Sequence, residues 1–391
     1  MATLVVKRGR AKPLWFGHPW IFSEAIAKCD ETVEPGDEVR VIDEDGRFIG
    51  RGFVNPRSQL RVRLASRQDQ PLDDAWFSER LADAAKIRTR LGLPSVETNA
   101  YRLVNSEGDY LPGLVVDVYG DAVAVQFTTL AMKLREEAIF DALTRQLAPR
   151  TIFEVAAGAF ARLEGFQSPA RVARGEPRSM VSCLENGLKL GVEPLSGQKT
   201  GYYLDQRENH LLASGFAAGK RVLDLYCYVG GFSLAAARAG ASAVTAVDVS
   251  ARALERTQAH FQENGLGRLE AVESDVFRYL EQAPARSFDL VVCDPPKFAR
   301  GRKDVTAALK GYQRLNTLAL QACAPEAVLC TATCSQLIDL DDFERALAGA
   351  ARDARRTLRV SRIASQASDH VLPVAFPEGR YLKFLVCHVG S

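Results

Sequence analysis

The chain has 391 residues, 47% hydrophobic and 25% charged with a formal net charge of +2, a balance typical of soluble globular proteins and a length that favours two or three domains. The sequence contains no run of about 18 apolar residues, so we expect no transmembrane helix. The eight cysteines form neither a Cys-x-x-Cys pair nor a cluster with the five histidines, so we expect no metal site and no disulfide framework. An apolar run precedes the first bases, the reverse of a secretory signal, which predicts a cytoplasmic protein.

The first domain is expected over residues 1–70, where short strands are separated by turns. Residues 38–42 alternate in polarity, Asp45-Gly46 signals a hairpin turn, and 47–53 supply the partner strand. Residues 60–64 alternate apolar side chains with arginines, which gives one buried and one basic face. This pattern is typical of a small β-barrel or sandwich.

Basic residues are concentrated in this first domain although the whole chain is nearly neutral. Four bases and no acid precede Glu24, and five arginines and no acid occupy residues 51–67. Such local stripes suit a phosphate-binding face, but a solvated surface explains the charges equally well. The candidate phosphate contacts are Lys7, Arg8, Arg10, Arg57 and Arg61.

A central α+β domain is expected over residues 72–194. Helical periodicity covers 75–91 and 130–147, and an Asn186-Gly187 turn predicts a hairpin over 184–190. Strands are expected at 101–104, 113–119, 122–127 and 151–156. We find no catalytic constellation in this domain and expect a scaffold.

The third domain, residues 195–391, alternates strand and helix. Apolar strands are expected at 221–226, 243–248, 269–273, 288–293 and 327–331, and helices at 232–239, 250–264, 276–282 and 305–323. This alternation favours a doubly wound parallel sheet, which binds its ligands at the carboxyl ends of the strands.

Acidic residues stand at four of these strand ends in order. Asp224 precedes a turn that runs through Tyr226 to Gly230-Gly231-Phe232, where glycines let a ligand approach the backbone and the acid suits an ammonium group. Asp248 ends the next strand, where a carboxylate can accept both hydroxyls of a ribose. Asp275 is placed to meet an adenine amino group.

The fourth strand ends in Asp294-Pro295-Pro296-Lys297-Phe298. Ordinary helix caps are the alternative for Asp224, Asp248 and Asp275, but capping accounts neither for the Gly-Gly turn nor for Asp-Pro-Pro.

These residues resemble the class I S-adenosylmethionine-dependent methyltransferases. Over essentially its full length, the chain is more specifically similar to the large-subunit ribosomal RNA cytosine-C5 methyltransferase I family. The strings that carry the resemblance are Gly17-His18-Pro19-Trp20-Ile21-Phe22-Ser23, Lys199-Thr200-Gly201-Tyr202-Tyr203-Leu204-Asp205-Gln206-Arg207, Tyr228-Val229-Gly230-Gly231-Phe232, Asp294 to Phe298, Thr333-Cys334-Ser335 and Pro377-Glu378-Gly379-Arg380-Tyr381-Leu382-Lys383. Residues 158–176 depart from the family pattern, and so does Cys227.

The resemblance implies a fold of class α/β: an N-terminal PUA-like RNA-binding barrel, a central α+β module and a C-terminal Rossmann-like class I methyltransferase domain. It implies S-adenosylmethionine as cofactor and RNA, 23S ribosomal RNA in this family, as partner. Tyr202 and Asp205, ahead of the first strand, are then expected to fold over the cofactor or the target base. Each tyrosine of this string could equally pack as part of a helix start.

The resemblance also implies that Cys334 is a nucleophile. C5 of a pyrimidine is a poor nucleophile, and a thiolate that adds to C6 makes C5 enolate-like. Lys297 is a candidate to stabilise this thiolate. Asp294 could contact the cofactor or the cytosine amino edge, serve as the base, or only shape its turn. Without the resemblance, Cys334 would be interpreted as a packed core thiol like Cys330.

Three alternatives to cytosine-C5 methylation remain. Asp-Pro-Pro-Lys-Phe also resembles the loops of enzymes that methylate exocyclic base nitrogens, in which an aromatic ring, here Phe298, stacks on a guanine or adenine. The second alternative is a non-catalytic RNA-binding or ribosome-assembly factor, which the run of acids disfavours. The third is a small-molecule methyltransferase, which the basic first domain disfavours. The sequence does not reveal which cytosine is modified or whether the substrate is naked RNA or an assembled particle. It also leaves open which base removes the C5 proton and whether the protein forms a homodimer.

Overall fold

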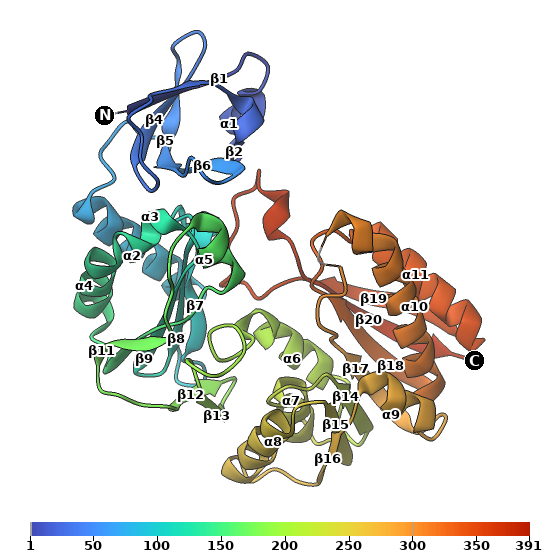
Figure 1. Ribbon diagram of the computed structural model, residues 1–391. Helices are drawn as coiled ribbons and strands as arrows, with labels where there is room; N and C mark the ends of the chain where they lie inside the picture. The colour runs from blue at the N-terminus through green and yellow to red at the C-terminus, as the bar shows by residue number, and fades with distance from the viewer. Residues whose placement is uncertain (1, 300) are drawn as a thin grey trace. The chain divides into compact units, whose positions relative to one another are not determined.

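The computed structural model describes residues 2–299 and 301–391 and divides into two compact units (Figure 1). Of the described residues, the first unit comprises 2–187, Gly191–Leu204 and Ser368–Gly379, and the second Leu188–Leu190, 205–299, 301–367 and Arg380–Ser391. The chain therefore leaves the second unit near its end, contributes a short segment to the first, and returns.

The first unit begins with a six-stranded sheet in the order β2-β6-β5-β4-β1-β3. The predicted hairpin is present, and Gly46 in its turn has a φ of 80°, a left-handed conformation that glycine adopts without strain. A four-residue helix, α1 (Lys12–Trp15), is too short to leave a periodic pattern in the sequence. The strands are β1 (Ala2–Val6), β2 (Trp20–Phe22), β3 (Ile26–Cys29), β4 (Glu38–Asp43), β5 (Phe48–Val54) and β6 (Leu60–Ser66).

A second sheet of the first unit has the order β11-β10-β9-β8-β7 and carries the predicted α+β pattern. The helix expected over 130–147 is interrupted at Arg135, whose guanidinium donates to the carbonyls of Ala131 and Gly36 and lies over the Phe53 ring. The elements are α2 (Asp74–Arg90), β7 (Ala100–Asn105), β8 (Leu114–Tyr119), β9 (Ala122–Phe127), α3 (Leu130–Lys133), α4 (Glu136–Leu147), β10 (Thr151–Glu154), α5 (Ala159–Glu164) and β11 (Arg171–Gly175). The last two lie in the segment 158–176 that departs from the family pattern.

A buried ion pair holds the late segment Ser368–Gly379 within the first unit. The Arg88 guanidinium binds both carboxylate oxygens of Asp109 and donates to the main-chain carbonyl of Asp369 at 2.6 Å. The Asp369 side chain in turn accepts from the Arg102 amide at 2.9 Å. All three charged side chains of this group are almost inaccessible to water, so the segment is fixed there by groups that would be costly to leave unpaired.

The predicted hairpin is formed by β12 (Val181–Glu185) and β13 (Leu188–Val192), which turn through left-handed Asn186 and Gly187.

The second unit contains a seven-stranded sheet in the order β16-β15-β14-β17-β18-β20-β19. The first five strands are parallel, as predicted, whereas β20 runs antiparallel to both β18 and β19. Figure 1 places α6, α7 and α8 on one face of the sheet and α9, α10 and α11 on the other. The bounds are α6 (Arg207–Ser214), β14 (Arg221–Leu225), α7 (Gly231–Arg238), β15 (Ala243–Asp248), α8 (Ala251–Glu263), β16 (Leu269–Glu273), α9 (Val276–Gln282), β17 (Phe288–Cys293), α10 (Val305–Ala322), β18 (Cys323–Thr333), α11 (Leu340–Ala354), β19 (Thr357–Ala364) and β20 (Lys383–Gly390).

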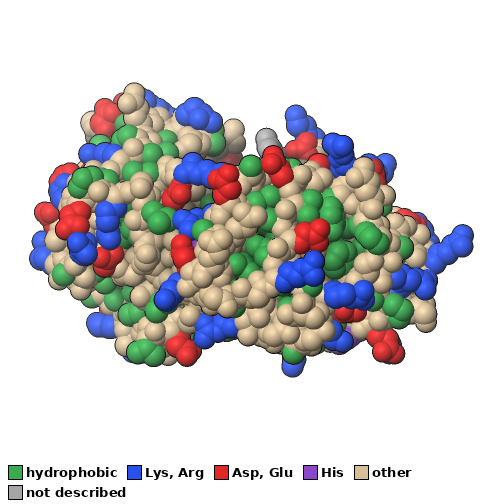
Figure 2. Space-filling view, turned by 90° about the horizontal axis from the view of Figure 1, so that it is seen from below, with side chains coloured by type: hydrophobic (Ala, Val, Ile, Leu, Met, Phe, Trp, Pro, Cys, Tyr) green, Lys and Arg blue, Asp and Glu red, His purple; other side chains and the backbone are tan. Residues whose placement is uncertain are grey.

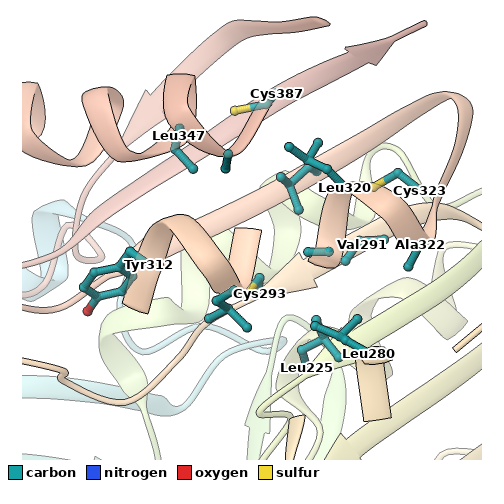
Figure 3. Packing of buried hydrophobic residues seen from close by; sticks show 14 of the residues in the cluster. Leu225, Leu280, Val291, Cys293, Tyr312, Leu320, Ala322, Cys323, Leu347 and Cys387 are labelled. Atoms are coloured by element: carbon teal, nitrogen blue, oxygen red, sulfur yellow. The ribbon is translucent and has the colours of Figure 1, made fainter. Parts of the chain in front are cut away.

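The main core of this unit lies between the sheet and the α9–α11 layer (Figure 3). Leu225 and Val291 of the sheet pack there with Leu320 of α10, and Cys293, Cys323 and Cys387 fill it as small apolar side chains. Six of the eight cysteine side chains are buried, whereas Cys29 and Cys334 are partly exposed. Exposure therefore separates Cys334 from the core thiols.

On the face drawn in Figure 2, basic and acidic side chains are interspersed, with apolar atoms exposed between them. No helix among the described residues is both long and apolar enough to span a bilayer. In that same part of the chain, no group of three or more His, Cys, Asp and Glu side chains is arranged to hold a metal ion.

Candidate active site

The predicted acids and Cys334 come together at one edge of the second unit's sheet. Because β14, β15, β16, β17 and β18 are parallel neighbours, their carboxyl ends meet there. Main-chain hydrogen bonds join the segments beyond the strands: the Cys227 amide donates to Val247 at 3.1 Å and the Ser274 amide to Asp248 at 3.1 Å. The ordered set of strand-end residues is thus assembled as the sequence suggested.

The turn after β14 has an unusual backbone. Tyr226, Tyr228 and Gly230 have φ values of 62°, 49° and 87°, so two tyrosines adopt a left-handed conformation that costs a non-glycine residue about 1–2 kcal/mol. A Cβ on Gly230 would also lie 2.5 Å from the Thr257 methyl group. Gly231 is buried and begins α7. Strain of this kind is typical of turns that hold a ligand.

Phe232 lies inside an aromatic group rather than at the turn's surface. It is 7% exposed, stacks on Phe384 with ring centroids 5.7 Å apart, and meets the His210 ring edge-on at 4.4 Å. Its contribution within this unit is to pack α7 against α6 and β20. A direct cofactor contact from Phe232 stays a prediction.

Asp224 is a buried carboxylate with one oxygen unsatisfied. Its Oδ2 accepts from the amide and the hydroxyl of Ser233 at 3.0 and 2.6 Å, while Oδ1 has no hydrogen-bond partner in the described part of the chain. Burial raises the pKa of Asp224 to about 7, although the Ser233 hydrogen bonds and His210 oppose that shift. An ammonium group at this turn would supply the missing partner and restore the charged carboxylate.

Asp248 is half-buried and uses both oxygens locally. Oδ2 accepts from the Tyr228 amide at 2.9 Å and Oδ1 from the Ser250 amide at 2.9 Å. Each carboxylate oxygen has a second lone pair, so two ligand hydroxyls can still be accepted. The same carboxylate therefore shapes the β14 turn and fits the ribose role predicted for it.

Asp275 is an N-cap, as the structural alternative proposed. Its Oδ1 accepts from the Arg278 amide at 3.0 Å and begins α9. The side chain is nevertheless exposed at the same sheet edge, where its second oxygen can accept from an amino group. Together, an unsatisfied buried carboxylate, a two-hydroxyl acceptor and an exposed acceptor fit the ammonium, ribose and adenine groups of S-adenosylmethionine.

Asp294 is held by two buried amides that the sequence analysis did not single out. The Gln206 Nε2 donates to Asp294 Oδ2 at 2.9 Å, and the Asn209 Nδ2 donates to Gln206 Oε1 at 2.6 Å and to the Ser365 carbonyl at 3.1 Å. Because Asn209 faces Gln206 with its NH2 group, Gln206 must present its own NH2 group to Asp294. Asp294 Oδ2 is thereby kept as an acceptor.

Cys334 follows β18 directly and is partly exposed between two fully buried neighbours, Thr333 and Ser335. The Thr333 hydroxyl donates to the Tyr312 hydroxyl at 2.8 Å and accepts from the Ser335 amide at 3.2 Å. This network fixes the backbone on both sides of the thiol. The Lys383 ammonium donates to the Ser335 carbonyl at 3.1 Å, so a second lysine, missed from the sequence, lies beside the thiol's segment.

The two other members of the Asp294 loop differ in exposure. Lys297 is exposed to solvent, whereas the Phe298 ring is half-buried and packs on Tyr312 with centroids 4.6 Å apart. Phe298 therefore links the loop after β17 to the network beside Cys334. Its stacking on a base stays a prediction.

Tyr202 and Asp205, the two candidates ahead of β14, belong to different units. Tyr202 belongs to the first unit, where it is 3% exposed and its hydroxyl donates to Glu185 at 3.4 Å. Asp205 belongs to the second unit and accepts from the Tyr381 hydroxyl at 2.6 Å and, through its carbonyl, from Ala367. Asp205 joins the strand-end residues within one unit, and Tyr202 does not.

The basic residues of the first domain divide into exposed and internally paired ones. Lys7, Arg8, Arg10 and Arg57 are exposed and Arg61 is half-buried, although Arg8 already pairs with Asp45 at 2.9 Å. Two other arginines in residues 51–67 form ion pairs within the protein: Arg51 binds Glu38 and Asp69, and Arg63 binds Glu107. The basic face is therefore narrower than the sequence pattern suggested.

Comparison with known proteins gives matches to two domain families. Residues 4–67 match a PUA-like domain, and residues 134–367 match an S-adenosylmethionine-dependent methyltransferase. These matches agree with the fold class expected from the sequence.

Similar curated proteins span the whole chain. Ribosomal RNA large subunit methyltransferase I of Alteromonas mediterranea is 36% identical over 99% of both chains, and that of Shewanella denitrificans is 37% identical over 98% of both. Among solved structures, an S-adenosylmethionine-dependent methyltransferase from Streptococcus mutans has a TM-score of 0.84 at 23% identity, covering 99% of this chain and 100% of its own. A methyltransferase solved in complex with SAH has a TM-score of 0.86 at 24% identity with the same coverage.

Proposed function

Because the chain belongs to the ribosomal RNA large subunit methyltransferase I family, we propose that it methylates a base of large-subunit ribosomal RNA, and that this base is a cytosine modified at C5. The chain is an S-adenosylmethionine-dependent methyltransferase with a PUA-like domain ahead of its catalytic domain. Its three proposed domains are residues 1–70, 72–194 and 195–391.

One observation carries the C5 proposal: an acid and a partly exposed thiol follow adjacent strands of the cofactor-binding sheet. β17 and β18 are paired with Cys293 opposite Thr331, so Asp294 and Cys334 leave the sheet one and three residues beyond a shared rung. Asp224 is the last residue but one of the neighbouring β14, and Asp248 ends β15. A nucleophile is thereby paired with an acid beside the residues proposed to hold the cofactor.

The chemistry assigned to Cys334 is nucleophilic activation of the base. The Cys334 thiolate adds to C6 of the cytosine, and the electron pair displaced toward C5 makes that carbon nucleophilic. Bound S-adenosylmethionine supplies an electrophilic methyl group on a sulfonium. After C5 is methylated, loss of its proton to a base returns the electron pair, the C6–S bond breaks, and the Cys334 thiolate is regenerated.

Asp294 is proposed to select cytosine. Held as an acceptor by Gln206, its carboxylate is suited to accept from the exocyclic 4-amino group of cytosine. Uracil presents a carbonyl oxygen at that position, which would face the carboxylate as a second acceptor. The Gln206–Asp294 hydrogen bond thus supports discrimination between the two pyrimidines.

The exposed bases of the PUA-like domain are proposed to bind the RNA backbone. Lys7, Arg10 and Arg57 are exposed; the Lys7 ammonium donates to the Glu24 carbonyl at 2.9 Å, whereas the Arg10 side chain makes no hydrogen bond or ion pair in the described part of the chain. Exposed cationic side chains of this kind suit phosphate contacts. Lys7, Arg8, Arg10, Arg57 and Arg61 together form the proposed RNA-contacting set.

The decisive experiment replaces the proposed nucleophile. We expect Cys334→Ala to lower methyl transfer to transcribed 23S ribosomal RNA at least about 1,000-fold while S-adenosylmethionine affinity stays within about twofold, because only the covalent step is lost. Cys330→Ala, which removes a buried thiol from β18, the strand that leads to Cys334, is the matched control and should retain transfer. Mass spectrometry of the digested nucleosides identifies the product.

Two results would contradict this proposal. Methyl transfer retained by Cys334→Ala, with the label on guanine or adenine, would favour the exocyclic-nitrogen alternative at the Asp294–Phe298 loop. A wild-type protein that binds RNA but shows no calorimetric binding of S-adenosylmethionine would favour the assembly-factor alternative.

A further inference from the structure

Lys383 occupies a register position that faces the end of the strand before Cys334. It is the first residue of β20, and its Cα is paired with that of Thr333, the last residue of β18. Antiparallel partners in a ladder lie about 5 Å apart, so the lysine side chain starts next to the segment that bears the thiol. Two chain segments separated by nearly 50 residues meet at this point.

The Lys383 ammonium is anchored but lacks an anionic partner. Its Nζ donates to the main-chain carbonyls of Ser335 at 3.1 Å and Tyr381 at 3.4 Å. Lys383 forms no ion pair with a carboxylate in the described part of the chain, although its side chain is partly buried. A partly buried cation without a counter-ion favours any anion that forms beside it.

The electrostatics of the neighbourhood agree with this geometry. Burial lowers the pKa of Lys383, the charges of Asp339 and of an ionised Cys334 raise it, and the charge of Lys297 lowers it. The interaction with Cys334 is reciprocal, because a thiolate that favours the charged lysine is itself favoured by that lysine. The core thiol Cys330 differs, because burial raises its pKa and two nearby thiols add to that shift.

We propose that Lys383 is a positioning residue that stabilises the thiolate of Cys334, so that the proposed nucleophile is charged when the base arrives. The proposal rests on the proposed function for the use of that thiolate, but not for its formation. It replaces Lys297, the candidate from sequence, as the principal cation. Lys297 is exposed, and its charge is screened by solvent, whereas Lys383 is held by two carbonyls.

The experiment measures the ionisation of Cys334 directly. The full-length protein without RNA is alkylated with iodoacetamide at a series of pH values, and the rate at each cysteine is read by mass spectrometry of its peptide. Cys29, the other partly exposed cysteine, is the internal reference; burial raises the pKa of its thiol. The variants are Lys383→Met, Lys383→Arg and the matched control Lys297→Met.

We expect Lys383→Met to raise the alkylation midpoint of Cys334 by about one pH unit and to leave that of Cys29 unchanged, because an adjacent cation commonly shifts a pKa by this amount or more. Lys383→Arg should restore most of the wild-type midpoint, and Lys297→Met should change it less. An unchanged midpoint in a folded Lys383→Met protein, or an equal shift in Lys297→Met alone, would overturn the proposal.

A measurement on the wild type keeps the proposal open to refutation if Lys383→Met fails to fold. The Cys334 midpoint should lie below that of Cys29 and below its own value in the urea-unfolded chain, and a higher native midpoint would refute the proposal. The acid limb of the pH–rate profile for methyl transfer should move with the alkylation midpoint. If the midpoint moves and the limb does not, the thiolate contact stands and the proposed nucleophilic role of Cys334 fails.

Discussion

The side chains of Asp224, Asp248 and Asp275 are held by partners no more than 20 residues away in sequence, whereas Asp294 and the Cys334 segment also have partners 88 and 48 residues away. Asp224 is bound by Ser233, nine residues away, and Asp275 by Arg278, three residues away. Asp294 is bound by Gln206 across 88 residues, and the Cys334 segment by Lys383 across 48. The proposed cofactor side is built locally and the proposed target side through tertiary contacts.

This difference explains why the sequence predicted the contacts of the cofactor side better than those of the target side. A local motif places an acid and the backbone amides it binds within one stretch of sequence, so its spacing indicates its chemistry. A side chain that acts through a contact of 48 or 88 residues leaves no spacing to detect. Variants on the two sides should therefore affect cofactor binding and methyl transfer separately.

Apart from Cys334→Ala, the largest expected effect is on the cofactor side. Asp248→Ala should weaken S-adenosylmethionine binding about 100-fold, because it removes the proposed hydroxyl acceptor and leaves the amides of Tyr228 and Ser250 without partners. Asp275→Ala, which removes an exposed cap, is the matched control and should cost only a few-fold. Isothermal titration calorimetry measures both, and equal losses would break the proposed division of roles.

An intermediate effect tests the target side. Gln206→Leu should lower kcat for methyl transfer about 10- to 100-fold, the usual value of a hydrogen bond to a charged group, and should leave the Kd for S-adenosylmethionine unchanged. Asn209→Asp, which keeps an acceptor beside Gln206 but loses the donor, should allow Gln206 to flip and reproduce part of the loss. A change in cofactor Kd without a change in kcat would contradict the tertiary assignment of Asp294.

The smallest expected effect is a pH dependence at Asp224, whose pKa burial raises to about 7. The folded apoprotein holds this proton more tightly than the unfolded chain, so its stability should fall as pH rises from about 4 to about 7. An ammonium partner favours the charged carboxylate, so cofactor affinity should rise about fivefold between pH 6 and 7, below the pKa of the ligand's α-amino group. Thermal unfolding and calorimetry across this range check both trends, which Asp224→Asn should flatten; a flat wild-type profile would exclude the role.

Much of the fold was predictable because it depends on periodicity and turn chemistry. The parallel strands β14 to β18, the Asp45-Gly46 and Asn186-Gly187 turns, and helix α2 all lie where the residue pattern predicted them. The interruption of the helix at Arg135 was not predictable, because that residue bonds to Gly36, almost 100 positions earlier. The antiparallel strands β19 and β20 were likewise missed; β20 pairs with β18, whose Thr333 lies 50 positions before Lys383, and β19 joins the sheet only through β20.

The sequence by itself determined the ordered acids at the strand ends, the Gly-Gly turn after Asp224, and membership of a methyltransferase family. Only the tertiary structure decided which side chains act on those groups. It showed that Arg51 and Arg63 are paired internally, that Gln206 keeps Asp294 an acceptor, and that Lys383 lies beside the Cys334 segment. The reason is physical: backbone propensity and capping act over a few residues, whereas burial and charge act between any groups that folding brings together.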